Sequence, residues 1–254
     1  PPRSTPLYSS AASDVYKRQG SILFFRASDG TNASALWKSD GTVAGTVLVK
    51  DINPGGIGSA PNTLTNLNGV LHFAAADAAN GWELWKSDGT TAGTELLREV
   101  AANLPIRSPR YLTVVNNVFY FSAIDYAYGQ ELWKSDGTTA GTRIVNDINM
   151  AGDADPDNLT NVNGTLFFTA FRGSVGRELW KSNGTWESTV PVKDIYPGSR
   201  SSNQRNFTNV NGTLFFSADD GVNGEELWKS DGTSAGTTMV KDILAGSDAS
   251  FPQH

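Results

Sequence analysis

Apolar and polar residues follow one another in short blocks along the chain, and no stretch shows the period of a helix. In residues 62–100, the block Val70–Ala76 is apolar on both faces, which indicates a central β-strand. It follows Asn68-Gly69, a strong two-residue hairpin signal, and the half-polar block Leu64–Leu67, which predicts a partner strand. Equivalents of the apolar block recur as Ile22–Arg26, Val118–Ser122, Thr165–Thr169 and Thr213–Ser217.

Two further strands complete this unit. Glu83–Lys86 predicts a third strand, Ser87–Thr94 is rich in turn-forming residues, and Glu95–Val100 predicts a fourth strand. Counterparts of the fourth strand are Val47–Ile52, Arg143–Ile148, Val190–Ile195 and Thr238–Ile243. The pattern therefore predicts a meander of antiparallel strands that is repeated along the chain.

A motif that spans the third strand and the following turn sets the period of the repeat. LWKSDGT begins at Leu36, Leu84, Leu132 and Leu227, and LWKSNGT begins at Leu179. The tryptophans of the motif are 48, 48, 47 and 48 residues apart: Trp37, Trp85, Trp133, Trp180 and Trp228. Four antiparallel strands in about 48 residues have the size of one β-propeller blade. The sequence predicts an all-β fold, a β-propeller of five such blades, in either a closed ring or an open arc.

Pro191 indicates how each blade is oriented. It lies midway along the fourth strand of the fourth unit. Proline has no N–H to donate to a ladder and is confined to edge strands. We therefore expect the fourth strand at the outer edge of the blade and the first strand beside the central channel.

The repeat accounts for residues 20–254. It begins at Gly20, directly before a second strand, so the first blade is expected to lack its innermost strand unless Asp14–Lys17 is recruited in its place. Residues 1–19 match no part of the repeat, and their segment SSAASDVYKRQ resembles the translated adapter sequence at the ends of metagenomic gene fragments. We expect this tail to be artefactual or disordered, and the array to have been cut from a longer one.

Composition argues against several classes of protein. The formal net charge is −6, and lysine and arginine form no basic run, which argues against a nucleic-acid partner. No apolar stretch approaches the roughly 18 residues of a membrane span, so no membrane insertion is expected. The chain has no cysteine, which removes disulfides, thiolate nucleophiles and cysteine-based metal sites.

The segment ELWKSDGTTAGT, with the VKDI that follows a turn later, resembles the ELWxxDGT-repeat family of bacterial β-propeller-like proteins. The resemblance covers residues 20–254. It implies a propeller-like fold and an exported protein, extracellular or at the cell surface, and it transfers no catalytic residue. The first unit departs from the motif at Ala35, and the fourth departs at Asn183 and at Trp186-Glu187-Ser188.

The residues that recur in the motif suggest structural roles first. A tryptophan buries about 150–250 Å², so we expect the five repeated rings to anchor the packing. The turn aspartates resemble the Asp-box of sialidases, itself a structural turn: Asp40, Asp88, Asp136 and Asp231. The repeated glutamates are expected either to accept backbone N–H groups or to face a ligand: Glu83, Glu131, Glu178 and Glu226.

One acidic loop allows a metal hypothesis. Asp153, Asp155 and Asp157 alternate along the chain, and calcium takes oxygen ligands at such spacing. The EF-hand pattern fails, because the twelfth position of the loop would be Gly164 instead of glutamate. A calcium site and a solvated acidic loop are both open interpretations, and no other cofactor is expected.

Sequence signatures of catalysis are absent. The two histidines, His72 and His254, are far apart, and no glycine-rich phosphate loop leads from a strand into a helix. Arginines in the variable loops leave a glycoside hydrolase or another propeller enzyme as a weaker alternative. We therefore expect that the chain is not an enzyme.

Comparison of the units separates two sets of loops. The first-to-second and third-to-fourth strand loops are near-copies, whereas the second-to-third and inter-blade loops differ and should emerge on the opposite face. Variable loops on a rigid scaffold commonly carry binding residues. The candidate ligand contacts on this face are Trp82, Tyr126, Tyr128, Phe171, Arg172, Arg177 and Asn223. Alternatively, these rings simply cover the tops of the blades.

The predicted function is binding. The first interpretation is a non-enzymatic scaffold of an exported bacterial protein, with a protein or glycan partner at a surface. The alternative is a lectin-like propeller with one sugar site in each blade. A lectin of this kind needs the same polar and aromatic set in every unit. The second-to-third strand loops differ between units, which favours the first interpretation.

Overall fold

The computed structural model describes residues 16–55, 57–98 and 109–252. Within these residues, twenty strands pair into five four-stranded antiparallel sheets. The first sheet contains β1 (Tyr16–Gln19), β2 (Ile22–Ala27), β3 (Ala35–Ser39) and β4 (Val47–Lys50). The second contains β5 (Asn62–Leu67), β6 (Val70–Asp77), β7 (Gly81–Ser87) and β8 (Glu95–Arg98). The third contains β9 (Arg110–Val115), β10 (Val118–Asp125), β11 (Gly129–Ser135) and β12 (Arg143–Asn146).

The fourth and fifth sheets repeat this plan. The fourth contains β13 (Asp157–Val162), β14 (Thr165–Arg172), β15 (Gly176–Ser182) and β16 (Val190–Lys193). The fifth contains β17 (Arg205–Val210), β18 (Thr213–Asp219), β19 (Glu225–Ser230) and β20 (Thr238–Lys241). Among the described residues there is no helix long and apolar enough to cross a membrane.

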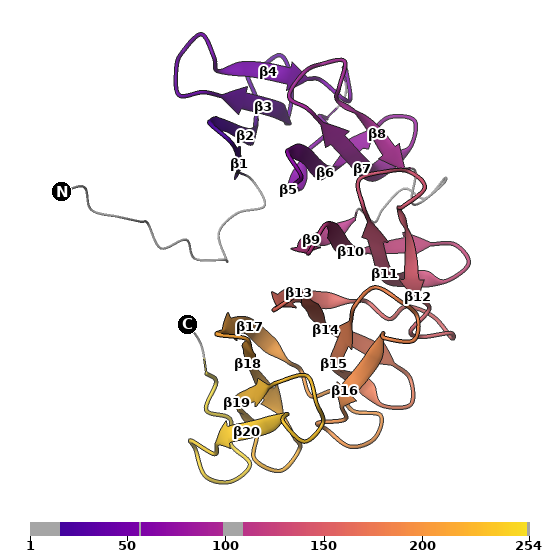
Figure 1. The fold of residues 1–254 in the computed structure, drawn as a ribbon, viewed down its shortest axis with the longest axis vertical. Helices are drawn as coiled ribbons and strands as arrows, with labels where there is room; N and C mark the ends of the chain where they lie inside the picture. Colours follow the sequence, from indigo (N-terminus) through magenta and orange to yellow (C-terminus); the bar gives the residue numbers. More distant parts are fainter. Residues whose placement is uncertain (1–15, 56, 99–108, 253–254) are drawn as a thin grey trace, which may run out of the picture.

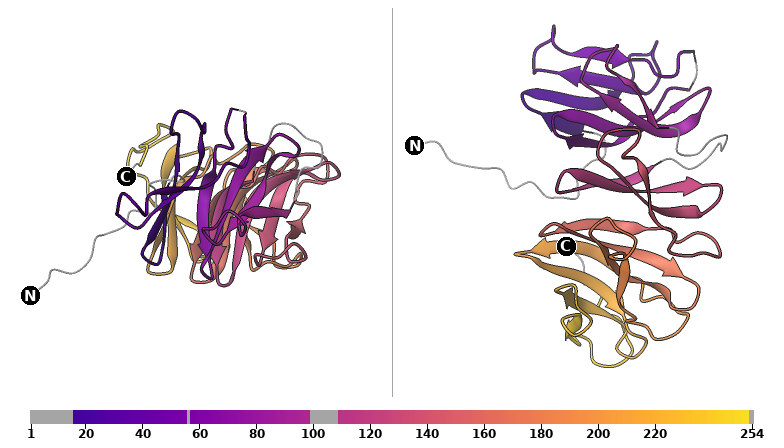
Figure 2. Two further views of the ribbon diagram at one scale, coloured as in Figure 1. Left: turned by 90° about the horizontal axis from the view of Figure 1, so that it is seen from above. Right: turned by 45° about the vertical axis from the view of Figure 1, so that its right-hand side comes forward.

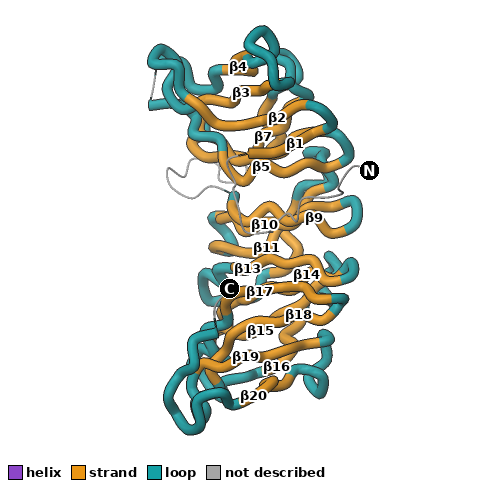
Figure 3. The backbone as a smooth tube through the Cα atoms, turned by 90° about the vertical axis from the view of Figure 1, so that its left-hand side faces the viewer, coloured by secondary structure: helices purple, strands orange, loops and turns teal. Residues whose placement is uncertain are grey.

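The sheets are arranged like propeller blades in an open arc (Figure 1). Each first strand contacts the first strand of the next sheet, from β1 to β5 and onward to β17. These strands line the concave side, as the view in Figure 3 shows. The strands run between the two flat faces of the arc (Figure 2), so the two loop sets emerge on opposite faces. The predicted five-bladed, all-β propeller architecture is confirmed, and the described sheets do not close into a ring.

The first sheet is more complete than the sequence predicts. β1 pairs with β2 from Tyr16 opposite Phe25 to Gln19 opposite Ile22. The expectation that this blade lacks its innermost strand was therefore wrong. The inner edge of β2 offers unpaired backbone groups, and Gly20, at a φ of 62°, makes the tight turn that brings a preceding segment back onto it. Residues 1–15, the rest of the expected tail, lie outside the described residues.

The outer edge of each blade is its fourth strand. β16 pairs with β15 alone among the described strands, and Pro191 on β16 stands opposite Trp180. Proline is tolerated there because no further strand needs its missing N–H. β16 is shorter than the predicted strand, since it ends at Lys193, and the chain then crosses to the next sheet. The end of the predicted strand Glu95–Val100 lies outside the described residues.

The repeated tryptophan packs between neighbouring sheets. Trp133 is 3 % exposed and shares a cluster with Leu84 and Leu97 of the preceding sheet. Leu132, its neighbour in the strand, belongs to the next cluster, with Trp180 of the following sheet. Alternate side chains of β11 therefore pack into the interfaces on both sides of the third sheet. Trp37, in the first sheet, is half-buried.

The repeated aspartate organises the turn between the third and fourth strands. Asp136 Oδ1 accepts hydrogen bonds from the Thr138 N–H at 2.9 Å and from the Thr138 hydroxyl at 2.7 Å. The same bonds form at Asp40, Asp88 and Asp231. The bond from the Thr138 hydroxyl is the main cause that lowers the pKa of Asp136. These contacts confirm the structural interpretation of the repeated aspartates.

A glycine in the same turn makes room for the aspartate. A Cβ on Gly141 would overlap Asp136 Oδ1, and the other units that have both residues show the same approach. The fourth unit has Ser188 at the glycine position and Asn183 at the aspartate position. There the Ser188 hydroxyl accepts from the Thr185 N–H at 3.2 Å, which replaces the lost carboxylate contact. The two departures of the fourth unit therefore compensate each other.

Gly141→Ser should destabilise the protein by about 1–3 kcal/mol, because the new side chain displaces the Asp136 carboxylate from its turn bonds. Adding Asp136→Asn should restore most of this loss, since the pair then matches the fourth unit. Urea unfolding of the wild type, both single variants and the double variant gives the coupling energy. Additive effects of the two substitutions would contradict the compensation.

Candidate functional site

The candidate contacts predicted from the sequence are spread over four sheets. Trp82 is half-buried on β7, and Phe171 is half-buried on β14. Tyr126 and Tyr128 lie in the loop between β10 and β11, with 71 % and 45 % of their surfaces exposed. Of the predicted contacts, Arg172 lines a groove that is described below. The varied face therefore does not gather this set into one site.

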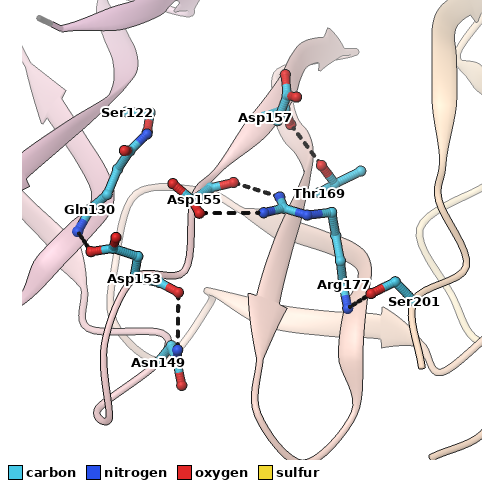
Figure 4. Close-up of polar contacts among 9 residues, drawn as sticks. All are labelled: Ser122, Gln130, Asn149, Asp153, Asp155, Asp157, Thr169, Arg177 and Ser201. Atoms are coloured by element: carbon cyan, nitrogen blue, oxygen red, sulfur yellow. Dashed lines mark hydrogen bonds and ion pairs between the residues drawn. The ribbon is translucent and has the colours of Figure 1, made fainter. Parts of the chain in front are cut away.

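Two of the predicted contacts help to order loops. Nη1 of Arg177 donates to the Asp155 carbonyl oxygen at 2.6 Å, and Nη2 lies 3.8 Å from Asp155 Oδ2 (Figure 4). Nδ2 of Asn223 donates to Asp220 Oδ2 at 2.8 Å within its own loop. These bonds give both side chains a role in the scaffold.

The three aspartates of the acidic loop do not share a centre. Asp153 Oδ1 accepts from the Gln130 N–H at 2.8 Å, Asp155 pairs with Arg177, and Asp157 Oδ1 accepts from the next backbone N–H. Figure 4 shows Asp153 and Asp155 directed to these separate partners, with Asp157 set apart from both. In the described ranges, no three His, Cys, Asp or Glu side chains gather as a metal site requires. The three carboxylates therefore make separate contacts within the scaffold, and a calcium site in this loop stays a prediction.

The repeated glutamates hold the chain as it leaves each fourth strand. Oε2 of Glu131 accepts from the Ile148 N–H at 3.0 Å, and Oε2 of Glu178 accepts from the Ile195 N–H at the same distance. Burial raises the pKa of Glu131 to about 8 and that of Glu178 to about 7. For Glu131, the nearby Asp147 carboxylate adds to the rise in pKa. Of the two roles expected for these residues, backbone acceptance is confirmed.

A groove of about 520 Å³ lies between the third and fourth sheets. Its walls are the loop that follows β12, the end of β14, and the turn that leads into β16. These segments place it at the outer rim of the arc, beside the fourth strands (Figure 1). Its exposed aromatic ring is Trp186, with 51 % of its surface accessible. Other lining residues are Asp147, Met150, Arg172, Trp180 and Glu187.

Three departures from the repeat meet in this groove. Asn146 ends its fourth strand where the others have a lysine or arginine: Lys50, Arg98, Lys193 and Lys241. Pro191 stands where the other units have Leu48, Leu96, Ile144 and Met239. Both departures shorten a side chain and leave space at the interface. Trp186 and Glu187 replace a smaller pair in the turn and add an aromatic and a charged wall.

Part of this groove could be predicted from the sequence. Arg172 is among the predicted contacts and Trp186 departs from the motif, but no pattern places the two together. Asn146 and Asp147 were not predicted, because they lie at the end of a fourth strand and not in a variable loop. A position-by-position comparison of the fourth strands would have shown that Asn146 interrupts a series of cations.

A second hollow, of about 310 Å³, lies between the second and third sheets around His72. His72 packs against Gly137 of the next turn, a position that larger rings fill elsewhere: Phe24, Tyr120 and Phe167. Its Nε2 is buried and has no hydrogen-bond partner among the described residues. Lys86 pairs with Glu95 here at 3.0 Å, whereas Lys38 reaches the turn carbonyl of the next sheet.

His72→Phe should raise the free energy of unfolding at pH 7 by about 1 kcal/mol, because it fills space and removes an unpaired nitrogen. Burial lowers the pKa of His72 from 6.5 to about 4. As pH falls, His72 therefore takes up its proton at a higher pH in the unfolded chain than in the folded protein. The stability that depends on neutral His72 is lost as pH falls from 6.5 toward 4. The variant lacks that loss. Melts at pH 7 and pH 5 measure both effects, and a variant less stable than wild type at pH 7 would refute the packing argument.

The fold and the repeat define a β-propeller, and comparison with known proteins agrees. No family model and no curated protein matches this sequence. Among solved structures, a puromycin hydrolase mutant complexed with PGG is similar over 91 % of this chain and 39 % of its own, with 12 % identity and a TM-score of 0.52. A prolyl endopeptidase is similar over 91 % of this chain and 34 % of its own, with 11 % identity and a TM-score of 0.53.

A third similar structure is a putative TolB from Agrobacterium tumefaciens, with 14 % identity and a TM-score of 0.49 over 93 % of this chain and 83 % of that protein. The chain thus spans well under half the length of the two hydrolases and most of the TolB chain. At these identities the likeness shows the fold alone.

One expectation about function needs correction. We expected that the chain is not an enzyme, and the structural neighbours contradict this, because they include a puromycin hydrolase and a prolyl endopeptidase. The match is to the propeller parts of these proteins. The absence of catalytic motifs in this sequence is therefore no ground for separating the chain from enzymes.

Proposed function

We propose that this chain is a ligand-binding propeller module and that it binds a segment of a partner protein in the groove between the third and fourth sheets. The observation that carries this proposal is the meeting of three departures from the repeat at one place. Substitutions that serve packing alone would be expected at scattered interfaces. Here the three departures lie at one interface, where they leave a groove and line it with an aromatic ring and a carboxylate.

The lining of the groove suits a peptide ligand. Trp186 and Met150 are 51 % and 78 % exposed, and Arg172 lines the same groove. Tryptophan, methionine and arginine are enriched at protein interfaces, and tryptophan and arginine are frequent hot spots. The carboxylates of Asp147 and Glu187 add hydrogen-bond acceptors for donors of the ligand.

A sugar ligand is the second candidate, because the exposed Trp186 ring beside Arg172 and Glu187 also suits stacking on a sugar. A lectin with a site in every blade is less well supported. The turn position of Trp186 is occupied in the other units by Val43, Thr91, Thr139 and Ser234. A sugar would therefore bind at one site and not at five.

We further propose that this protein is a bacterial ELWxxDGT-repeat protein that is exported or displayed at the cell surface. The support for this is the ELWKSDGTTAGT repeat.

Selection of displayed random peptides on the immobilised chain tests the binding proposal, together with a glycan array. We expect peptides whose binding falls at least about tenfold in Trp186→Ala, as for a hot spot. Tyr126→Ala, which removes an exposed ring outside the groove lining, is the matched control and should leave binding unchanged. Glycans that depend on Trp186 would favour the second candidate. Ligands that bind both variants equally would contradict the groove as the site.

A further inference from the structure

Three of the fourth strands place a cation at the turn of the next sheet. Lys50 Nζ donates to the Thr94 carbonyl oxygen at 2.7 Å, and Arg98 Nη1 donates to that of Thr142 at 2.7 Å. Lys193 Nζ donates to the equivalent carbonyl, that of Thr237, at 2.8 Å. The basic group is thus a built-in part of these interfaces.

Two of these cations lie near the repeated tryptophan. The Arg98 guanidinium carbon is 5.8 Å from the centre of the Trp133 ring, and Lys193 Nζ is 5.8 Å from that of Trp228. These distances are within the range of cation–π attraction. Each of these sites therefore combines a carbonyl acceptor with an aromatic ring.

The interface of the third and fourth sheets has the carbonyl acceptor and the aromatic ring but lacks the cation. Asn146 occupies the cation position, and its Nδ2 lies 3.4 Å from the carbonyl oxygens of Thr189 and Trp186, at the limit of a hydrogen bond. Thr189 and Trp180, the equivalents of the carbonyl and ring partners, both line the groove. The shorter side chain leaves space where Arg98 and Lys193 stand elsewhere.

Negative charge borders this space. Asp147 lines the groove, and its Oδ1 is buried with no hydrogen-bond partner in the described part of the chain. The exposed Glu187 lies on the opposite wall, next to Trp186 in the turn. A buried carboxylate oxygen without a donor is costly, and an incoming ammonium or guanidinium group would supply the missing donor.

We infer that the groove receives a lysine or arginine side chain of the partner, in the position that Arg98 and Lys193 fill at the other interfaces. This inference rests on the proposed function and names the chemistry of the ligand. The guest would donate to the Thr189 carbonyl and to Asp147, and its cation would lie near the Trp180 ring. Trp186 would cover its aliphatic stem, as an exposed ring does for long basic side chains.

Arg172 lies at the other end of the groove. It pairs with Gly176 in the ladder of β14 and β15, and Trp180 is four residues further along β15. At the rise of a strand, this separates the Arg172 and Trp180 positions by about 13 Å. The positive charge of Arg172 is therefore placed to meet a carbonyl or acidic group of the ligand, away from the basic side chain.

The test uses acetylated and amidated glycine pentapeptides with a central arginine, lysine or glutamine, titrated into the whole chain and followed by the indole N–H signals in NMR. We expect the arginine and lysine peptides to bind about fivefold or more tightly than the glutamine peptide. Asn146→Arg should abolish this preference, because it fills the position from within. It should also raise the melting temperature by donating to Thr189, as Arg98 does to Thr142.

Asp147→Asn provides a second variant that keeps the shape of the side chain, and it should weaken the charged peptides while leaving the glutamine peptide unchanged. Equal binding of the three peptides, or a preference that survives in Asn146→Arg, overturns the inference. Displayed peptides that need Trp186 but carry no basic residue also overturn it, while the proposed function stands. A failure to find any ligand that depends on Trp186 overturns the proposed function itself.

Discussion

Trp133→Ala is expected to lower the free energy of unfolding by about 3–5 kcal/mol, the range for truncation of a large buried aromatic side chain. Trp133 is 3 % exposed and lies in the cluster that joins the second and third sheets. Its ring centre is 6.2 Å from that of Phe121, and the Arg98 guanidinium lies 5.8 Å from the ring. Removal of the indole leaves a cavity in the middle of the arc, where sheets on both sides limit relaxation.

Urea unfolding followed by tryptophan fluorescence and by circular dichroism measures this loss, and agreement of the two probes checks that the array unfolds as one unit. Trp186→Ala is the matched control, since its ring is 51 % exposed and its loss should cost less than about 0.5 kcal/mol. If the two variants were equally stable, the repeated tryptophan would not be the anchor of the interfaces.

The protein is also expected to lose stability as pH rises from 5 to 8, by on the order of 6 kcal/mol in total from Glu131 and Glu178. Burial raises the pKa of Glu131 from 4.5 to about 8 and that of Glu178 to about 7. Between the unfolded and folded pKa values, the folded state retains protons that the unfolded state has released. Their contribution to stability is complete below pH 4.5 and is lost as pH rises through the folded pKa values.

Glu131→Gln should remove much of this slope and should be more stable than wild type at pH 8, with little difference at pH 5. The amide keeps an oxygen that can accept from the Ile148 N–H, and it carries no charge beside Asp147. Melting curves from pH 5 to pH 8 measure the effect. Glu187→Gln, on an exposed side chain, should retain the wild-type slope. An unchanged slope in Glu131→Gln would show that this carboxyl is ionised at little cost in the folded protein.

Most of the fold could be predicted because the strands and turns of each unit are encoded by patterns within that unit. The apolar block of β6, the turn at Asn68-Gly69 and the motif around Trp85 recur in register, so errors at one unit are corrected by the others. β1 was expected only if Asp14–Lys17 were recruited in place of a repeat strand, because Tyr16–Gln19 carries no trace of the repeat. The choice between an open arc and a closed ring escaped prediction, since ring closure depends on the angles between sheets and not on any pattern within one sheet.

The candidate site was harder to predict than the fold. The groove joins segments that are some forty residues apart, from Asn146 to Trp186 and Pro191, and strand pairing alone does not show that they meet. Tyr128 and the Asp153 loop were predicted as binding residues because their residue types suggest ligand or metal contacts in the sequence alone. The groove is instead marked by side chains that are short where the other units have long ones, and a gap of this kind has no motif.

The exchange in the turn of the fourth unit also constrains the path by which that unit diverged from its neighbours. Glycine cannot gain a side chain while the aspartate holds its place, because the two would overlap, as Gly141 and Asp136 show. In the fourth unit the Ser188 hydroxyl accepts from the Asn183 and Thr185 N–H groups, so the exchanged pair keeps the turn hydrogen-bonded. The two positions are therefore coupled, and the turn keeps its hydrogen bonds while it carries Trp186 and Glu187.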